Sequence, residues 1–272
     1  MNAARQVSEG FDLFFQLTDI LAGFGLCFAR IHPMMLLLPP MQRLGLTGLQ
    51  KTAMSVAIAI PAQPVLLHDI AQIDPNGLTL VLLALKEGLI GLALGIAVAA
   101  PFWIGETMGE LIDQQRASQS AIIEDPSHAS PAGMTATLLI LVLTLIFFET
   151  GGMGHLIDGV LASYSLWPVQ RMAPAFGPKS LSMFLALFDN VTAAGFVLAG
   201  PLLAAMLLGE LGLALVSRIA PQLNVFDLSM AMKGIIFVLG LPLTLSLVLQ
   251  SFHELLSPLM HMSTYLRSFA PG

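Results

Sequence analysis

The residues of this chain that could do chemistry are few, and their spacing fits no catalytic motif. No glycine-rich turn ends in Gly-Lys-Ser/Thr, as a phosphate-binding loop requires, and neither HExxH nor GxSxG occurs. The six histidines lack the spacing of metal ligands, and the lone Cys27 excludes an internal disulfide or a CxxC site. The sequence therefore predicts no enzyme and indicates no cofactor or metal.

The ionisable residues that stand out lie inside apolar stretches. Lys86 and Glu87 fall near the middle of one stretch, and Asp189 interrupts another. A charge within a membrane span is costly unless it is paired or reached by water. Neighbouring residues on a helix point about 100° apart, so we expect Lys86 and Glu87 not to neutralise each other, and Asp189 is a candidate partner for Lys86. Alternatively, both residues reach a wet interface or a partner subunit.

A long polar connection runs from Gly105 to Pro131. Glu106, Glu110 and Asp113 are spaced i, i+4 and i+7, so a helix would place all three carboxylates on one face. Long connections of this kind in compact proteins are usually functional. The segment is therefore predicted to line a cavity, and an ordinary solvated loop is the alternative.

A second polar region, Leu215–Lys233, joins two very apolar segments. Pro221 is expected to end or kink the preceding helix, and Asp227 is expected to cap the next one. A plain turn of a helical hairpin is the alternative interpretation.

The elements that must position these residues are membrane helices. The 272 residues are 56% hydrophobic and 10% charged, with a mean hydropathy of +0.83, whereas soluble domains carry roughly 25% charged residues. A net charge of -6 without a basic cluster excludes a nucleic-acid binder. The predicted fold is an all-α polytopic integral membrane protein. Its six hydrophobic segments are Phe11–Leu38, Leu49–Leu67, Leu78–Ile104, Ala132–Phe148, Leu181–Leu208 and Gly234–Leu256.

Prolines and small residues predict how these helices pack. Pro33, Pro61 and Pro64 predict kinks. Small residues at four-residue spacing predict close helix contacts; they are Gly91, Gly95 and Ala99, then Gly195 with Ala199, and Gly200 with Ala204. The glycine-rich run Gly151–Gly154 is predicted to be a flexible loop, with His155 as a solvated loop residue.

Three stretches resemble one protein family. They are KEGLIGLALG (Lys86–Gly95), GELIDQQR (Gly109–Arg116) and, most specifically, SRIAPQLNVFDLSMAMKG (Ser217–Gly234). The chain resembles, over nearly its whole length, the SctT/FliR family of the export apparatus of type III secretion systems and flagella. The run from Gln115 to Ser118, with Glu124-Asp125-Pro126 downstream, is more similar to the injectisome branch than to the flagellar branch.

The resemblance implies a multi-pass subunit of the bacterial inner (plasma) membrane. One copy would join SctR-like and SctS-like subunits in a pore for unfolded protein substrates, next to an SctV-like export gate protein and an SctU-like switch protein. Residues 1–180 would form an SctR-like helical portion that includes a plug loop at 105–131. Residues 181–272 would form an SctS-like hairpin and a C-terminal tail.

The resemblance also implies which residues face the pore and which face other subunits. The plug loop would present the pore-facing residues Gln114, Gln115, Arg116, Ser118, Ile122 and Ile123. A polar turn between apolar helices gains little from facing lipid, so the second region is predicted to contact other subunits. Its residues are Arg218, Pro221, Gln222, Asn224, Phe226, Asp227 and Lys233.

Two other functions are compatible with the composition. A small-solute or ion secondary transporter would use broken helices and intramembrane charges as a substrate site, although no inverted repeat relates the two halves of the sequence. A purely structural nucleator of the assembly would have no pore-lining role.

Overall fold

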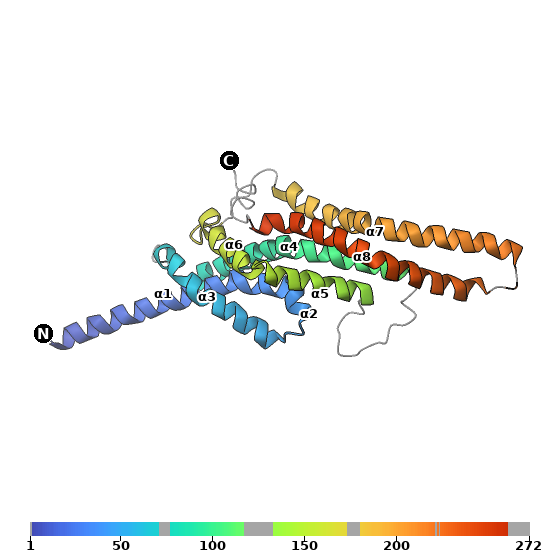
Figure 1. Cartoon of the computed structure of the whole chain (residues 1–272). Coiled ribbons are helices and arrows are strands. Elements are labelled where there is room, and N and C mark those ends of the chain that lie inside the picture. Colours follow the sequence, from blue (N-terminus) through green and yellow to red (C-terminus); the bar gives the residue numbers. More distant parts are fainter. Residues whose placement is uncertain are drawn as a thin grey trace. The chain divides into compact units, whose positions relative to one another are not determined.

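The computed structural model describes residues 2–70, 77–116, 133–172, 180–220, 222 and 224–260. Every regular element in these ranges is a helix, which confirms the all-α prediction (Figure 1). The helices are α1 (Asn2–Leu37), α2 (Pro39–Arg43), α3 (Gly48–Ile70), α4 (Gly77–Gln115), α5 (Met134–Glu149), α6 (Gly152–Leu166), α7 (Ser180–Ile219) and α8 (Val225–Met260).

Several of these helices are long and apolar enough to cross a membrane. Within the described ranges four pass this test, namely Leu17–Leu37 of α1, the whole of α4, Phe188–Ile219 of α7 and Asp227–Phe252 of α8. The bent pair of α5 and α6 would make a fifth span. The chain is thus a polytopic membrane protein, with four or five candidate spans rather than the six predicted. Helix α3 forms as expected but does not pass, and Gln50, Lys51 and Gln63 lower its hydropathy.

The chain divides into two compact units. Unit 1 comprises Met1–Ala99, Gly151–Met183 and Pro258–Gly272, and unit 2 comprises Ala100–Thr150 and Phe184–Ser257. Helix α4 therefore begins in unit 1 and ends in unit 2. This division follows contacts within the chain, whereas the division at residue 180 follows a family resemblance and stays a prediction.

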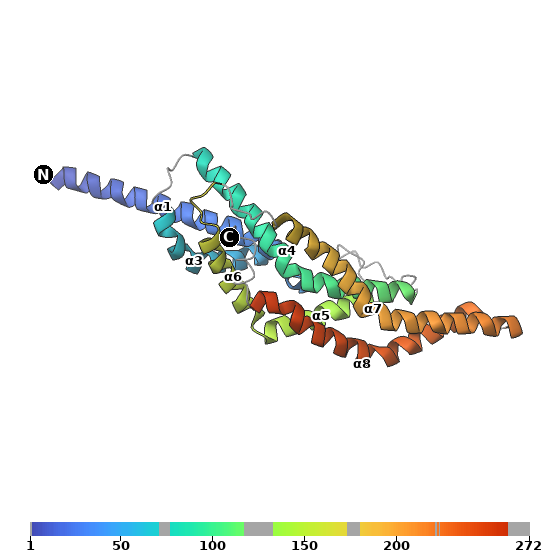
Figure 2. The ribbon, with the colours of Figure 1, turned by 90° about the horizontal axis from the view of Figure 1, so that it is seen from above.

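In unit 1, helix α1 packs against α3 and against the glycine face of α4 (Figure 2). A Cβ atom added at Gly91 would lie 2.0 Å from the carbonyl oxygen of Arg30, and one at Gly95 would lie 3.0 Å from the Cα atom of Met34. The predicted small-residue stripe is confirmed as a close helix contact, because only glycine leaves room for the α1 backbone at Gly91.

Two polar contacts also join α1 to α3. The Nδ1 atom of His32 lies 3.1 Å from the Ser55 hydroxyl, and the Gln63 side-chain amide donates to the carbonyl oxygen of Ile20 at 2.9 Å. Between these contacts lie buried apolar residues of both helices, Ile31 of α1 and Ala59 of α3. Unit 1 is therefore held by a mixed polar and apolar interface.

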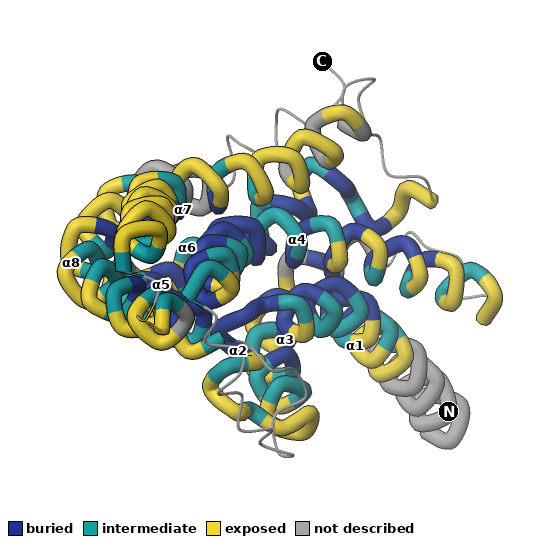
Figure 3. The backbone as a smooth tube through the Cα atoms, turned by 90° about the vertical axis from the view of Figure 1, so that its right-hand side faces the viewer, coloured by how far each residue is buried: buried dark blue, intermediate teal, exposed yellow. Residues whose placement is uncertain are grey.

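In unit 2, the end of α4 packs against α5, α7 and α8. Phe102 contacts Phe147 and Phe252 edge to face, with ring centroids 5.6 and 5.8 Å apart. A Cβ atom at Gly195 would lie 2.9 Å from the Thr107 side chain, so this part of the α7 stripe is a close contact. Among the described residues nothing lies within 4 Å of such an atom at Gly200, so the chain by itself makes no close contact there. Much of α7 and α8 is exposed (Figure 3).

Helix α6 was missed by the sequence. The prediction of a flexible loop at Gly151–Gly154 is wrong, because Gly152 to Gly154 begin this helix and His155 lies within it. Gly151 has a φ of 72°, a left-handed conformation that favours glycine, and it lies in the short break between α5 and α6. A glycine run beside a short apolar segment resembles a linker, which explains the error.

Candidate functional site

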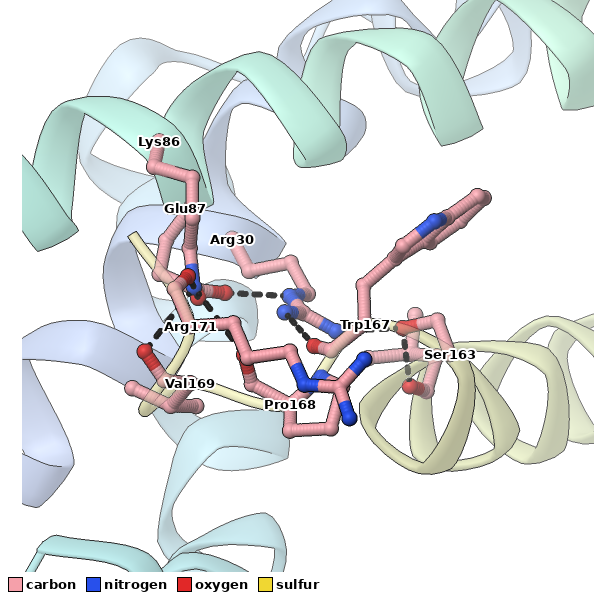
Figure 4. A network of polar contacts seen from close by, with 9 residues as sticks. Arg30, Lys86, Glu87, Ser163, Trp167, Pro168, Val169 and Arg171 are labelled. Atoms are coloured by element: carbon pink, nitrogen blue, oxygen red, sulfur yellow. Dashed lines mark hydrogen bonds and ion pairs between the residues drawn. The ribbon is translucent and has the colours of Figure 1, made fainter. Parts of the chain in front are cut away.

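Three buried charged residues, Arg30, Lys86 and Glu87, form a cluster in unit 1, which we call the arginine centre (Figure 4). Its core is an ion pair between Arg30 of α1 and Glu87 of α4, with Nε and Oε2 2.5 Å apart. Both side chains are 0% exposed. The close backbone contact at Gly91, one turn along α4, lets α1 approach near enough for this pair to form.

The remaining donors of Arg30 reach the end of α6. One guanidinium nitrogen donates to the Ser163 hydroxyl at 2.8 Å, and the other donates to the carbonyl oxygen of Trp167 at 2.9 Å. The guanidinium also lies 3.9 Å from the ring centroid of Tyr164, in a cation–π contact. Arg30 therefore connects residues that are 57 to 137 positions away in the sequence.

Lys86 holds the segment that follows α6. Its Nζ atom lies 2.7 Å from Oε1 of Glu87. It also donates to three backbone carbonyl oxygens, those of Pro168 at 3.2 Å, Val169 at 2.9 Å and Arg171 at 3.1 Å. An ammonium group has three protons, so these acceptors saturate it.

This geometry corrects the prediction for the adjacent charges. The expectation that Lys86 and Glu87 could not neutralise each other is wrong, because the long lysine side chain bends back to the second carboxylate oxygen of Glu87. Lys86 needs no contribution from Asp189, which is an exposed residue of α7 in unit 2.

The arginine centre carries two cations and one carboxylate, and carbonyl oxygens supply the remaining negative partial charge. Because Arg30 and Glu87 are fully buried and every side-chain nitrogen of Arg30 and Lys86 has an acceptor, the centre suits a scaffold better than a ligand site. It joins α1, α4, α6 and the segment after α6 into one body.

The predicted pore-facing residues lie at the end of α4 or beyond it. Gln114 is exposed and Gln115 is half-buried, and both belong to the last turn of α4. Arg116 follows the helix and lies 3.8 Å from the ring centroid of Phe237 on α8. Ser118, Ile122 and Ile123 lie outside the described residues. The predicted connection therefore begins later than expected, because Gly105 to Gln115 are helical.

The three carboxylates predicted to share a face differ in their surroundings. Asp113 is 1% exposed, whereas Glu106 is half-buried and Glu110 is exposed. Asp113 accepts hydrogen bonds from the start of α5, including one from the backbone amide of Thr135 at 2.8 Å. It therefore belongs to the α4–α5 contact within unit 2.

The predicted subunit-contact turn lies between α7 and α8. Helix α7 ends at Ile219, two residues before Pro221, in agreement with the prediction. Asn224 donates to Oδ2 of Asp227 in the first turn of α8, at 2.5 Å. Gln222, Asn224 and Asp227 are exposed, while Pro221 and the side chain of Phe226 lie outside the described part.

An ion pair within the hairpin involves the last residue of this predicted set. Lys233 of α8 pairs with Glu210 of α7, with Nζ and Oε2 3.0 Å apart, and the side chains are 10% and 45% exposed. Arg218 is exposed, and the acidic residue that precedes it on α7 is already engaged by Lys233.

Sequence reasoning missed two members of the arginine centre. Neither Arg30 nor Ser163 was singled out from the sequence. A fully charged residue within an apolar run is itself a signal for a buried partner, but Ser163 carries no such signal because serine is common in membrane helices.

Apolar helices joined by buried charges define the class of this protein, a multi-pass membrane protein. The family described as bacterial export proteins, family 1, matches residues 21–259. The chain belongs to this family, the SctT/FliR family of type III secretion export apparatus proteins, and resides in the bacterial inner membrane.

Curated relatives come from secretion systems and from flagella. The chain is 35% identical over 214 residues to the Yop proteins translocation protein T of Yersinia pestis, covering 78% of this chain and 82% of that protein. It is 30% identical over 239 residues to the surface presentation of antigens protein SpaR of Salmonella typhimurium, covering 87% and 88%. It is 29% identical over 153 residues to the flagellar biosynthetic protein FliR of Bacillus subtilis, covering 56% and 59%.

Proposed function

We propose that this export apparatus subunit forms, together with SctR-like and SctS-like subunits, the pore through which unfolded proteins enter a type III secretion system. One copy of the chain joins each assembly. Membership of the export family supports the general role, and the exposed apolar surface of α7 and α8 supports the need for partners.

The length and exposure of α7 and α8 are the observation that carries this proposal. At about 1.5 Å per residue, the 40 residues of α7 extend about 60 Å and the 36 residues of α8 about 54 Å. The hydrocarbon core of a bilayer is only about 30 Å thick. Yet large apolar side chains are exposed from Leu185 to Ile219 on α7 and from Leu228 to Leu249 on α8.

The exposed stretch of α8 matches the bilayer core, whereas that of α7, about 50 Å long, exceeds what lipid covers along an upright helix. In the most apolar windows of α7 and α8, only 28% and 17% of the residues are buried. Exposed apolar patches of this extent mark protein interfaces where they meet water. We expect helices of neighbouring subunits to cover this surface, as the family resemblance suggests. In this proposal, residues 181–272 form the SctS-like hairpin and residues 1–180 form the SctR-like portion.

We further propose that the plug loop lies within 105–131 and closes the pore through Gln114, Gln115, Ser118, Ile122 and Ile123, whereas Arg116, also predicted to face the pore, contacts Asp113 and Phe237. Small polar residues beside a few aliphatic ones tolerate water and still obstruct ions. The exposure of Gln114 at the end of α4 is compatible with this role.

The turn between α7 and α8 is proposed to contact neighbouring subunits, with the SctV-like protein beneath it and the SctU-like protein as a further neighbour. The turn presents both donors and acceptors through exposed Arg218, Gln222 and Asn224. The run from Gln115 to Ser118, which is more similar to the injectisome branch than to the flagellar branch, supports an injectisome.

Deletion of Gln114–Ile123 tests the pore function. The assembly that contains this deletion is expected to leak ions through the reconstituted pore, whereas the wild-type assembly stays closed. Unchanged conductance in an assembly of normal composition would contradict the plug. The chain reconstituted alone into liposomes is the control, because a secondary transporter would move solute without partners.

A further inference from the structure

The described ends of the α4–α5 connection are held together by the buried carboxylate of Asp113. Its Oδ2 accepts from the backbone amides of Thr135 at 2.8 Å and Ala136 at 3.3 Å, and its Oδ1 accepts from the Thr135 hydroxyl at 2.6 Å. Arg116 adds an ion pair, with Nη1 3.7 Å from Oδ1. These contacts all lie within unit 2.

Asp113 replaces the capping side chain that α5 lacks. The residue at the N-cap of α5 is Gly133, which has no side chain to satisfy the free amides of the first turn. A Cβ atom at Gly133 would lie 2.0 Å from Oδ2 of Asp113, so glycine is required for the carboxylate to reach these amides. The negative charge also lies at the favourable end of the helix dipole.

Arg116 extends this arrangement to a third helix. Its guanidinium, which pairs with Asp113, stacks at 3.8 Å on the ring centroid of Phe237 on α8. One guanidinium nitrogen also lies 3.4 Å from the Thr135 hydroxyl. A side chain held by α4, α5 and α8 is poorly suited to move with a loop.

We propose that Asp113, Thr135 and Arg116 form a clamp, which fixes where the connection leaves α4 and where it enters α5. Arg116 belongs to this clamp and not to the pore lining. The inference rests on the proposed function, since it assigns the positioning residues of the proposed plug loop and removes one residue from the plug itself.

A matched pair of substitutions on α5 tests the clamp. Thr135→Val removes a hydroxyl that bonds to Asp113, whereas Thr137→Val removes one that donates to Gly133 within its own helix turn. Thr135→Ser keeps the clamp hydroxyl and is the rescue variant. Each variant is incorporated into the complete assembly. Two quantities are then measured: the hydrogen-exchange rate of the backbone amides at residues 135 and 136, and the ion leakage after reconstitution.

The clamp predicts that Thr135→Val speeds exchange at these two amides by about tenfold, the effect of losing one hydrogen bond to a charged group, and raises ion leakage. Thr137→Val and Thr135→Ser are expected to match the wild type in both measurements. Equal behaviour of Thr135→Val and Thr137→Val would overturn the clamp.

The two proposals fail in different ways. Deletion of Ala117–Ile123 keeps Arg116 and therefore removes only the proposed plug. Leakage after this deletion, but not after Thr135→Val, would leave the plug intact and overturn the positioning role of the clamp. If the deletion does not leak, the plug fails, and exchange alone decides whether the clamp exists.

If Thr135→Val does not assemble, Arg116→Lys replaces it, since lysine keeps the charge and loses the flat stacking on Phe237. Wild-type exchange in that variant would then overturn the clamp.

Discussion

The polar side chains of the arginine centre are buried, whereas those of the turn between α7 and α8 are exposed. In the arginine centre, Arg30 and Glu87 are fully buried, and Lys86 is saturated by acceptors of the same unit. In the turn, Arg218, Gln222 and Asn224 remain exposed. The difference indicates that the first cluster stabilises the subunit itself, while the second is available to other molecules.

The largest expected effect on stability follows from removing the charge of Glu87. It is the one carboxylate in the described contacts of the arginine centre. Glu87→Gln leaves Arg30 and Lys86 as two buried cations without a counter-charge, which costs about 3–5 kcal/mol of folding free energy. Thermal unfolding in detergent, together with the yield of folded protein, measures this loss. Glu149→Gln changes an exposed glutamate at the end of α5 and serves as the control. Equal stability of the two variants would contradict the scaffold role.

A somewhat smaller effect is expected at the helix contact that positions this centre. Gly91→Ala would place a methyl group 2.0 Å from the Arg30 carbonyl oxygen, and overpacking of this kind costs about 1–3 kcal/mol. Gly88→Ala is the matched control, because its Cβ would lie at an ordinary 3.7 Å from the Ala29 carbonyl oxygen. Their melting temperatures should differ clearly, and a Gly91→Ala protein as stable as Gly88→Ala would refute the close contact.

The ion pair of the hairpin should matter less, because it is partly exposed. A double-mutant cycle of Glu210→Gln and Lys233→Met is expected to give a coupling below about 1 kcal/mol, since solvent screens the half-exposed carboxylate. Unfolding of the purified chain in detergent gives the four free energies. A coupling free energy as large as the loss of folding free energy in Glu87→Gln would show that the hairpin ion pair stabilises the chain as much as the arginine centre does.

The smallest effect on stability is expected in the turn. Arg218→Ala combined with Gln222→Ala and Asn224→Ala removes exposed side chains, so membrane insertion and melting temperature should stay at wild-type values. Assembly with partners and secretion should weaken if the turn contacts other subunits. Wild-type secretion by the triple variant would show that the turn is only a connection.

The sequence predicted the helical membrane class because long apolar runs have few alternatives in lipid. It also predicted a close helix contact at Gly91 and Gly95 from their spacing, but not that α1 is the partner. It did not predict α6, whose start at Gly152 resembles a loop in composition. Composition cannot distinguish a helix that begins with glycines from a linker.

The sequence also predicted the buried charged residues only in part. The sequence located Lys86 and Glu87, but it excluded their pairing because it considered the direction of each side chain and not the reach of lysine. It could not associate Arg30 with residues 163–167, since contacts over such separations depend on how the helices pack. For the same reason it could not show that Arg116, which is predicted to face the pore, contacts Asp113 and Phe237.

The most direct test of the proposed pore subunit is the mass of the native membrane complex that contains a tagged copy of this chain. The account predicts one copy of the chain together with several copies of SctR-like and SctS-like subunits. The triple variant Arg218→Ala, Gln222→Ala and Asn224→Ala should lower the yield of this complex. Recovery of the chain alone, or only with further copies of itself, from cells that still secrete would contradict the account.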